Sequence, residues 1–291
     1  MTTIDLASLN AVTPEEFATS LFGVFENAPW VAESAARVRP FATVAALHAA
    51  LMESARGAPA EVRLTFLRGH PELAGKVARA GAMTAESVAE QGSLGLNRLS
   101  DAEFERFEAL NAAYREKFGF PFIVCVRRHT RDSILSRFAR RLDNDVATEM
   151  DTALEEIGLI SRLRLVAAVT GPGVPVTTGR LSTHVLDTVR GRPAAGIPVS
   201  LHEIGASGSA EIVATVTNQD GRTDAPLIAG EPLRIGTYEL RFRVGEHFRG
   251  LTADPPFLDM VPLRFSVSEP EAHYHVPLLV SPWAYSTYRG S

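Results

Sequence analysis

Up to about residue 168, apolar residues recur every three or four positions, which is the spacing that places them on one face of a helix. Thr13-Pro14-Glu15-Glu16 and Ser100-Asp101-Ala102-Glu103 have the composition of capping boxes and predict two helix starts. Further helices are predicted after Thr43, Pro59 and Thr84, through the basic stretch 127–141, and from about Asp145 to Ala168. The pattern predicts an all-α helical bundle. The run 120–126 is apolar and too short to assign to a helix or a strand.

From about residue 181 the pattern changes to alternation, in which every second side chain faces the same side of a strand. The clearest case is 238–244, where Leu240, Phe242 and Val244 face one side and Arg241 and Arg243 the other. Other alternating segments are separated by turns rich in Gly, Pro, Asn and Asp. Short strands at this spacing predict an antiparallel β-sandwich.

Residues 170–180, between the two patterns, are mainly Gly, Pro, Thr and Val, with no charge before Arg180. Prolines remove backbone donors and glycines weaken regular elements, so this stretch is predicted to link two domains. The expected organisation is a helical domain at 1–169, a linker at 170–180 and a β domain at 181–291. Fully extended, such a linker spans at most about 35–40 Å.

The composition is that of a soluble globular protein, with 45% hydrophobic and 22% charged residues in a chain of 291. A net charge of −5 argues against nucleic acid or an anionic membrane surface as the main partner. No apolar run approaches the ~20 residues of a membrane helix, and the amino terminus lacks a signal-peptide pattern. Cys125 is the only cysteine, which excludes an intrachain disulfide and fits a reducing compartment. The expected location is the cytoplasm.

Candidate chemistry in the helical half begins with His70, in a Gly-His-Pro turn. Ser87, Glu90 and Gln91 share one face of a predicted short helix. An imidazole beside a carboxylate can move protons near neutral pH. In the structural alternative, His70 caps a helix end and Glu90 is solvated. The pattern alone favours this structural alternative.

Several motifs of this half resemble the 2-oxo-4-hydroxy-4-carboxy-5-ureidoimidazoline (OHCU) decarboxylase family over about residues 9–168. They are Phe22-Gly23, Asn27-Ala28-Pro29-Trp30, His70-Pro71-Glu72-Leu73-Ala74, Ser87 with Glu90-Gln91, Phe120-Pro121-Phe122-Ile123-Val124 and Arg162-Leu163-Arg164-Leu165. The resemblance implies decarboxylation without a cofactor. The protein would orient the carboxylate, stabilise the anion and deliver a proton to one face.

The resemblance also implies roles for individual residues. His70 and Glu90 would handle protons, and which of them protonates the carbon stays open. Arg164, rather than Arg162, would supply a fixed positive charge. The residues that would hold the ureido-imidazoline ring are Pro71, Ser87, Gln91, Phe122 and Ile123.

Histidines and one arginine stand out in the β half. His273 and His275 are predicted on one face of a strand, His184 on the first strand, and Arg222 in a loop after a glycine. His-x-His is a known metal-ligand spacing. The same residues suit metal-free hydrolysis, with a histidine activating water and the arginine holding the developing anion. A third interpretation is structural, and we assign His273 and His202 to it as partly exposed residues of the sandwich.

Four segments of this half resemble the 5-hydroxyisourate hydrolases of the transthyretin-like family: Leu181–Asp187, Gly221–Leu227, His273–Pro282 and Tyr285–Ser291. The resemblance implies that His184, Arg222 and His275 are catalytic, that Tyr288 and Ser291 line the same pocket, and that no metal takes part. His184 or His275 would activate water, and Arg222 would stabilise the anion formed at a ring carbonyl. The resemblance also implies a tetramer formed through this domain, with active sites at subunit interfaces.

Together the two resemblances predict a bifunctional enzyme of urate breakdown, with its domains in the order of the allantoin synthases. The β half would hydrolyse 5-hydroxyisourate to OHCU, and the helical half would decarboxylate OHCU to (S)-allantoin, with no cofactor. The linker suggests a tether that keeps the second site near an unstable product. The alternatives are a transthyretin-like binding module fused to a helical scaffold, or a chain in which only one half is active.

Overall fold

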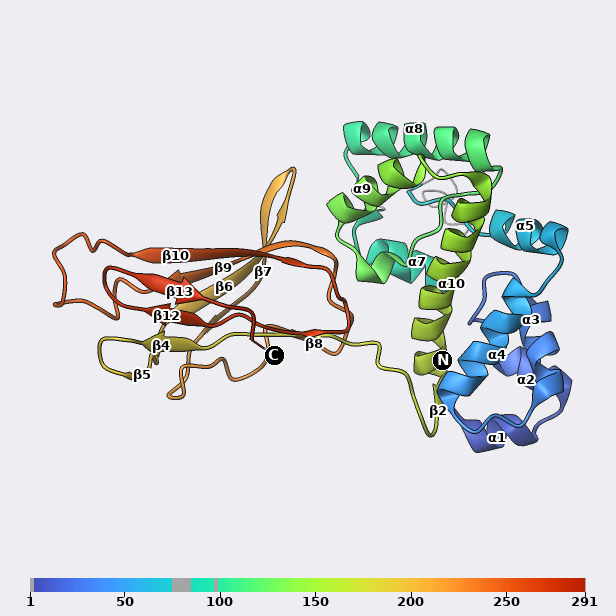
Figure 1. The fold of residues 1–291 in the computed structure, drawn as a ribbon, viewed down its shortest axis with the longest axis horizontal. Coiled ribbons are helices and arrows are strands. Elements are labelled where there is room, and N and C mark those ends of the chain that lie inside the picture. The colour runs from blue at the N-terminus through green and yellow to red at the C-terminus, as the bar shows by residue number, and fades with distance from the viewer. Residues whose placement is uncertain (1–2, 75–84, 97–98, 291) are drawn as a thin grey trace. The chain divides into compact units, whose positions relative to one another are not determined.

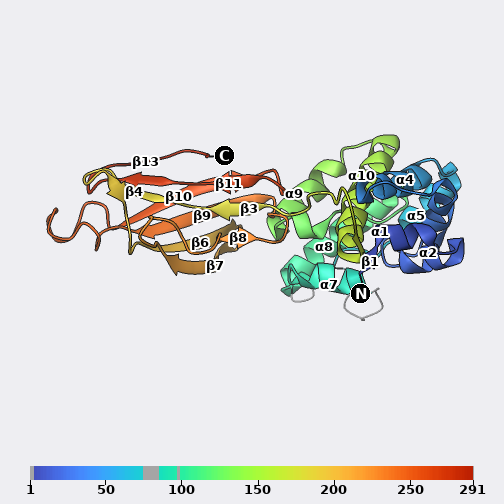
Figure 2. The same cartoon turned by 90° about the horizontal axis from the view of Figure 1, so that it is seen from below.

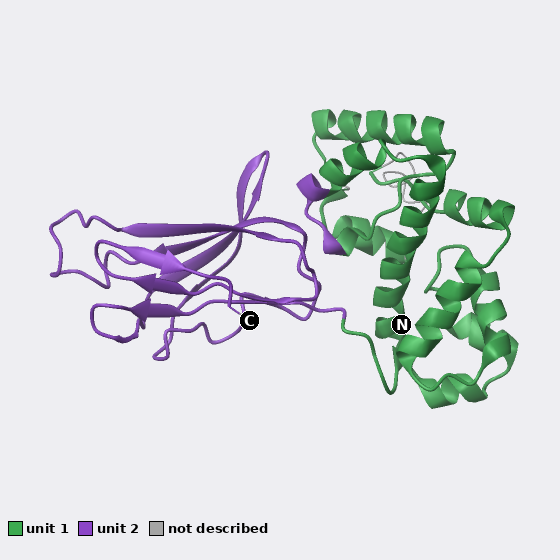
Figure 3. Cartoon of the chain, viewed as in Figure 1, with its two compact units in different colours: residues 1–127, 134–176 green, residues 128–133, 177–291 purple. Residues whose placement is uncertain are grey.

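The computed structural model describes residues 3–74, 85–96 and 99–290. The chain forms two compact units, one made of residues 1–127 and 134–176 and the other of residues 128–133 and 177–291 (Figure 3). Among the described residues, no helix is long and apolar enough to cross a membrane.

The first half of the chain is helical (Figure 1). Its elements are α1 (Leu6–Ala11), α2 (Pro14–Ser20), α3 (Pro29–Ala35), η1 (Ala36–Val38), α4 (Val44–Arg56), α5 (Ala60–Arg68), α7 (Ala85–Gly92), α8 (Asp101–Phe118), η3 (Val126–Arg128), α9 (Arg131–Arg141) and α10 (Val146–Ala168). The predicted helix starts at Thr13, Thr43 and Ser100 are confirmed, because each side chain accepts a hydrogen bond from the first turn. The predicted cap Thr84 lies outside the described residues. The pattern did not predict α1 or α3.

A short parallel pair interrupts the helical character of this half. β1 (Ile4–Asp5) pairs with β2 (Val169–Thr170), directly after α10. The prediction of an all-α domain is therefore correct for the packed helices, but the first and last segments of the domain, β1 and β2, are strands. α10 runs through the middle of the unit (Figure 1) and buries Ala153, Leu154, Ile157 and Leu165 in the main core.

The second half is built from short strands (Figure 2). They are β3 (Arg180–Ser182), β4 (Val185–Asp187), β5 (Arg192–Pro193), β6 (Pro198–Gly205), β7 (Gly208–Val216), β8 (Ile228–Ala229), β9 (Gly236–Arg243), β10 (Met260–Val267), β11 (His273–His275), β12 (Leu278–Val280) and β13 (Tyr285–Thr287). One sheet has the order β10-β9-β6-β7 and is antiparallel throughout. The predicted alternation in β9 is confirmed, since Leu240 and Phe242 are fully buried and Arg243 is exposed.

The other sheets contain parallel pairs, so the prediction of a wholly antiparallel β half was wrong in this respect. Their orders are β11-β3-β8 and β13-β12-β4-β5. β3 pairs with β11, and β4 with β12, in parallel. These partners are about 90 residues apart in the chain. No tight hairpin joins them, so nothing in the connection imposes an antiparallel direction.

Two neighbouring breaks in these sheets lie beside the candidate site. Thr183 and His184 separate β3 from β4, and residues 276–277 separate β11 from β12. Hydrogen bonds cross between the breaks, from the Leu278 amide to the His184 carbonyl at 2.8 Å and from Thr183 Oγ1 to the Val276 carbonyl at 2.7 Å. The breaks are therefore held in register, and the backbone of His184 is fixed.

Part of the predicted linker is bound to the helical unit. The amides of Val44 and Ala45, at the start of α4, donate to the carbonyls of Pro172 and Gly173 at 2.9 and 3.1 Å. On the other side, the Gly179 amide donates to the Glu231 carbonyl at 2.9 Å. Residues 174–178 remain between these bonds, and such a segment spans at most about 17 Å.

Candidate functional sites

His70 follows α5 directly, where Gly69 ends the helix. Its Nδ1 lies 3.0 Å from the carbonyl oxygen of Phe66, and because a carbonyl can only accept, Nδ1 carries the proton. Burial, outweighing the charge of Glu26, lowers the pKa of His70 to about 4. The imidazole is therefore neutral at pH 7 and has a lone pair on Nε2 that can accept a proton.

Arg164, near the end of α10, lies between two carboxylates. Its Nε and Nη2 donate to the two oxygens of Glu90 at 3.0 and 2.8 Å, and its Nη1 donates to Glu26 at 3.0 Å. Glu26 is 4% exposed and Glu90 is 18% exposed. Burial lowers the pKa of Arg164, but hydrogen bonds and charge from Glu90 and Glu26 raise it above its usual value. Arg164 is a permanent cation at this position.

Residues on α7 connect this ion cluster to the turn that carries His70. Ser87 Oγ donates to Glu26 at 3.1 Å. The Gln91 side chain accepts from the Ala74 amide at 3.0 Å and donates to the Glu72 carbonyl at 3.2 Å. One helix therefore positions the carboxylate of Glu90 and supports the backbone after His70.

A single pocket contains the helical-half residues that the sequence singled out. They are His70, Pro71, Ser87, Glu90, Gln91, Phe122, Ile123 and Arg164. Arg162 is on another face, where it lines a separate hollow with His48. Apolar side chains such as Val24, Leu73 and Ile157 complete the pocket wall. Charged groups in such apolar surroundings interact more strongly than they would in water.

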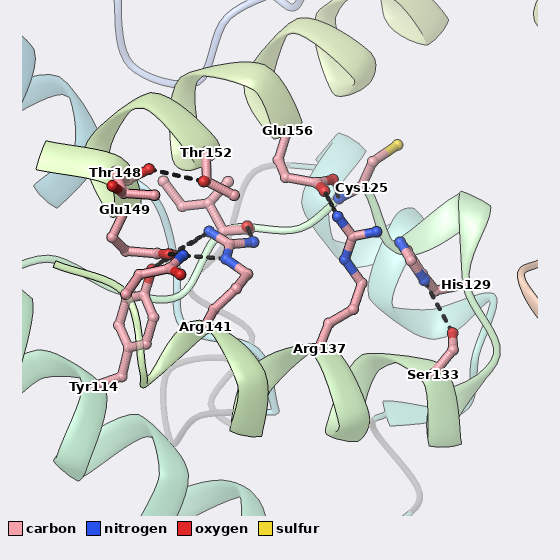
Figure 4. A network of polar contacts seen from close by, with 12 residues as sticks. Tyr114, Cys125, His129, Ser133, Arg137, Arg141, Thr148, Glu149, Thr152 and Glu156 are labelled. Carbon is pink, nitrogen blue, oxygen red and sulfur yellow. Dashed lines mark hydrogen bonds and ion pairs between the residues drawn. The ribbon is translucent and has the colours of Figure 1, made fainter. Parts of the chain in front are cut away.

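The wall formed by Phe122 and Ile123 belongs to the apolar run 120–126, which has no regular structure before η3. Its backbone is bonded by side chains from α9 and α10 (Figure 4). Arg141 Nη1 donates to the Ile123 carbonyl at 2.7 Å, and the Cys125 amide donates to Glu156 at 2.8 Å. These buried side chains fix the position of the pocket wall.

Arg141 is itself held by a buried carboxylate. Its Nε donates to Glu149 at 2.7 Å, and the Tyr114 hydroxyl donates to the same carboxylate (Figure 4). Burial, together with a hydrogen bond to Glu149, raises the pKa of Tyr114. Tyr114, Arg141 and Glu149 come from α8, α9 and α10, so one cluster joins three helices behind the pocket wall.

A second cluster lies at the strand breaks of the β half. His184 and Arg222 form an isolated antiparallel bridge, and Gly221 has a φ of +70° there. A Cβ on Gly221 would lie 2.4 Å from the Val185 carbonyl, so only glycine allows this approach. Among the described residues, the buried His184 Nε2 has no hydrogen-bond partner. Burial, and then the charge of Arg222, lower the pKa of His184, while a bond to the Asp220 backbone opposes the shift.

His275 closes the same cluster from β11. Burial is the first cause of its lowered pKa, followed by Arg222, His273 and His184. Its Nδ1 lies 3.0 Å from Ser182 Oγ, and the backbone of Gly290 forms a bridge with it. His184, Arg222 and His275, which the sequence singled out, are therefore within electrostatic reach of one another.

The carboxyl-terminal residues of the predicted site are only partly described. Tyr288 is 57% exposed, next to the Gly290 bridge. Ser291 lies outside the described residues. Among the described residues, no three His, Cys, Asp or Glu side chains gather in an arrangement that could hold a metal ion.

The structure adds residues that the sequence did not single out. Glu26 lies between the quoted motifs Phe22-Gly23 and Asn27–Trp30, and this neighbourhood was the only available signal for it. Ser182 precedes His184 by two positions in the quoted segment Leu181–Asp187. Its bonds to His273 and His275 depend on strand pairing over some 90 residues, which spacing along the chain does not reveal.

Comparison with known proteins gives a match for each half. The OHCU decarboxylase family matches residues 10–166, and the HIUase/transthyretin family matches residues 181–290. A 5-hydroxyisourate hydrolase of Deinococcus radiodurans is 57% identical over 113 residues, covering 38% of this chain and 95% of that protein. An OHCU decarboxylase of Haloferax volcanii is 38% identical over 162 residues, covering 56% of this chain and 94% of that protein. This chain is also similar to the crystal structure of (S)-allantoin synthase. The alignment covers 99% of this chain and 100% of that protein, with 34% identity and a TM-score of 0.53.

Proposed function

The chain belongs to the OHCU decarboxylase family in its first half and to the HIUase/transthyretin family in its second, and we propose that each half acts at the residue cluster described above. It is a bifunctional enzyme of urate breakdown that hydrolyses 5-hydroxyisourate to OHCU and decarboxylates OHCU to allantoin. The observation that carries the assignment of sites is the gathering of the expected residues, distant in sequence, into one pocket and one cluster.

In the decarboxylase half, Arg164 binds the carboxylate of the substrate. In the structure, Glu90 occupies the two donors of Arg164 that present a fork suited to a carboxylate. The substrate carboxylate replaces Glu90 there, while the more buried Glu26 keeps Arg164 in position. Pro71, Ser87, Gln91, Phe122 and Ile123 surround the ring.

Proton transfer is then divided between His70 and Glu90. Loss of CO₂ leaves its bonding electron pair on the ring, where the neighbouring imine delocalises it. The ring hydroxyl loses its proton and becomes a carbonyl, while the former imine carbon gains a proton on one face. His70 Nε2 holds a lone pair and accepts the proton of the ring hydroxyl. Glu90, displaced from Arg164 by the substrate, receives a proton from solvent and delivers it to that carbon.

This assignment separates two measurable quantities, CO₂ release and product chirality. His70→Asn should stop CO₂ release, because the acceptor of the hydroxyl proton is lost. Glu90→Gln should release CO₂ and yield allantoin of reduced optical purity, because solvent then protonates either face. The exposed Glu33→Gln is the matched control and should leave both unchanged. Full optical purity from Glu90→Gln, or normal CO₂ release from His70→Asn, would refute the assignment.

In the hydrolase half, His184 activates water. Its Nε2 has no hydrogen-bond partner among the described residues and its pKa is lowered, so at pH 7 this nitrogen accepts a proton from water. Arg222 stabilises the anion that forms at the attacked carbonyl. His275, on the other strand, gives a proton to the ring nitrogen that leaves. Tyr288 and Ser291 of the carboxyl-terminal tail line the pocket.

The β half also provides the surface for self-association. β13 is the edge strand of its sheet, and its three residues are exposed. Trp283, Tyr285 and Tyr288 are 61%, 47% and 57% exposed around this edge. An unpaired edge with exposed aromatics is suited to pairing with a second copy. The sheets then form the two layers of a transthyretin-like sandwich, assembled as a tetramer, and light scattering of the full chain tests this assembly.

The function as a whole is tested with the freshly made product of urate oxidase. Ultraviolet absorbance follows ring opening, and circular dichroism follows the formation of chiral allantoin. Both rates should exceed the spontaneous rates, and the product should be the S enantiomer. Spontaneous rates for both steps would favour a binding module on a helical scaffold instead.

A further inference from the structure

Ser182 connects two histidines of the β half. Its Oγ lies 2.8 Å from Nε2 of His273 and 3.0 Å from Nδ1 of His275. β3 and β11 pair in parallel with Ser182 opposite His275, and His273 faces the same side because it precedes His275 by two residues. Ser182 is 8% exposed, whereas His273 is exposed. The three side chains form a row from the hydrolase cluster to solvent.

A hydroxyl in this position couples the two rings, because it has one proton to donate. If Ser182 donates to Nδ1 of His275, it must accept from Nε2–H of His273. His275 then carries its proton on Nε2. A Cβ on Gly290 would lie 2.8 Å from Cδ2 of His275, the ring carbon next to Nε2, so the carboxyl-terminal tail passes close to this edge.

We propose that Ser182 and His273 relay a proton from solvent to His275, which passes it to the departing ring nitrogen. The inference rests on the proposed hydrolase function. In the relay, water protonates Nδ1 of His273, Nε2–H of His273 passes to Ser182, and the Ser182 hydroxyl proton passes to Nδ1 of His275. Nε2–H of His275 then goes to the nitrogen as the carbon–nitrogen bond breaks.

The proton count closes over the cycle. One proton travels from solvent to the leaving nitrogen, and each histidine of the relay changes tautomer. Before the next turnover Nε2 of His275 takes a proton from water and the row returns one to water through Nδ1 of His273, which restores the starting tautomers. His184 takes one proton from the attacking water and returns it to solvent. Hydrolysis consumes one water, and every group recovers its charge.

The charges around His275 explain why a relay is useful there. The charges of Arg222, His273, His184 and Arg180 all act on it, and they disfavour a second proton on its ring. His275 therefore does not act by first becoming an imidazolium. A neutral ring can still donate from Nε2 when its Nδ1 receives a proton at the same time. Ser182 and His273 are thus positioning and relay residues, and His275 is the catalytic one.

The test uses the full chain and the ring opening of 5-hydroxyisourate. Ser182→Ala and His273→Gln should lower kcat about tenfold or more with little change in KM, because general acid catalysis is impaired and binding is not. Ser182→Thr, which keeps the hydroxyl, should recover most of kcat. The dependence of kcat on the deuterium fraction of the solvent should be curved in the wild type, because several protons move, and linear in Ser182→Ala.

A second Ser–His pair supplies the matched control. Ser200 Oγ lies 2.9 Å from Nε2 of His202 on β6, outside the cluster, so Ser200→Ala and His202→Gln should leave kcat unchanged. OHCU decarboxylation by the same molecules reports on the other unit and should be normal in every variant. If the wild type opens the ring and folded Ser182→Ala has the same kcat and the same curvature, the relay is wrong and the function stands. If the wild type does not exceed the spontaneous rate, the proposed function itself fails.

Discussion

At the scale of single residues, Arg164 meets two carboxylates that differ in their freedom to move. Glu26 is almost fully buried and is also bonded by Ser87, whereas Glu90 is on a helix face with greater exposure. If Arg164 had a single carboxylate partner, its exchange for the substrate would leave a buried charge briefly unpaired. An unpaired charge in an apolar pocket has a high free energy. A permanent partner in Glu26 avoids that state.

This difference predicts a large effect of Glu26→Gln, although Glu26 does not act on the reacting atoms. Removing its charge should misplace Arg164 and lower kcat/KM for OHCU about 100-fold, and it should reduce the free energy of unfolding by about 2 kcal/mol. Glu26→Asp, which keeps the charge, should recover part of kcat/KM. Steady-state decarboxylation and thermal denaturation measure the two effects, with Glu33→Gln as the control. Wild-type kcat/KM in Glu26→Gln would contradict a positioning role.

The lowered pKa of His70 predicts a pH profile without an inflection near 6.5. Because burial lowers this pKa to about 4, the neutral, proton-accepting form persists as the pH falls from 8 to 5. kcat/KM for decarboxylation should be level over this range and should decline only as the pH approaches 4. His48, whose pKa burial also lowers to about 4, lies outside the pocket, so His48→Gln should have the same profile. An inflection near pH 6.5 that is absent from His70→Asn would show a normal imidazole.

At the scale of elements, local signals were predictable and long-range ones were not. The caps at Thr13, Thr43 and Ser100 could be identified because a cap and its helix are a few residues apart. The run 120–126 could not be assigned, because its backbone bonds to side chains of α9 and α10. The parallel pairing of β3 with β11 and of β4 with β12 could not be predicted either, because these partners are about 90 residues apart in the chain.

The candidate sites show the same limit. The resemblance identified individual motif residues, and the structure gathers those of the helical half in one pocket. Pattern alone had favoured a structural role for His70, because nothing near it in sequence reveals the charges that it meets. The prediction that His273 is an exposed residue of the sandwich agrees with the structure, but its bond to Ser182 could not be predicted, because it crosses between strands. Spacing along the chain predicts which residues share a face of a helix or strand and which residues cap a helix. Contacts between distant elements can be identified only from the folded structure.

The cluster of Tyr114, Arg141 and Glu149 predicts separable effects on stability and binding. Arg141→Met should lower the free energy of unfolding by about 3–5 kcal/mol, because Glu149 remains as an unpaired buried charge. It should also raise KM for OHCU, because the Ile123 carbonyl loses its donor and the pocket wall moves.

Combining Arg141→Met with Glu149→Met and Tyr114→Phe should restore most of the stability, since apolar side chains of similar volume often replace a buried polar cluster. KM should stay raised, because the Ile123 carbonyl still lacks its donor. The exposed Arg140→Met, one position earlier on α9, is the control. Denaturant unfolding and steady-state kinetics measure the two effects. A KM that recovers together with stability would show that Arg141 acts only through the fold.

At the scale of the whole molecule, each set of described site residues belongs to one unit. The pocket with His70 and Arg164 is in the helical unit, and His184, Arg222 and His275 are in the β unit. Only residues 174–178 of the predicted linker are outside the hydrogen bonds that anchor its two ends. Because the two units are parts of one chain, the fusion supplies the two active sites in equal numbers. A shorter path of the intermediate between the sites would be a separate consequence.

A cleavable linker separates these two consequences. With a protease site inserted between Pro175 and Val176, cutting should leave both kcat/KM values unchanged, because residues 174–178 belong to neither set of site residues. A small intermediate released into water diffuses away far faster than typical turnover of 1–10³ s⁻¹, so a tether without an enclosed path does not concentrate it. The lag before allantoin forms, followed by circular dichroism in cut and uncut protein at equal concentration, should therefore be the same. A longer lag after cutting, with both separate rates intact, would show that the intermediate passes directly between the sites and that the tether has a kinetic role.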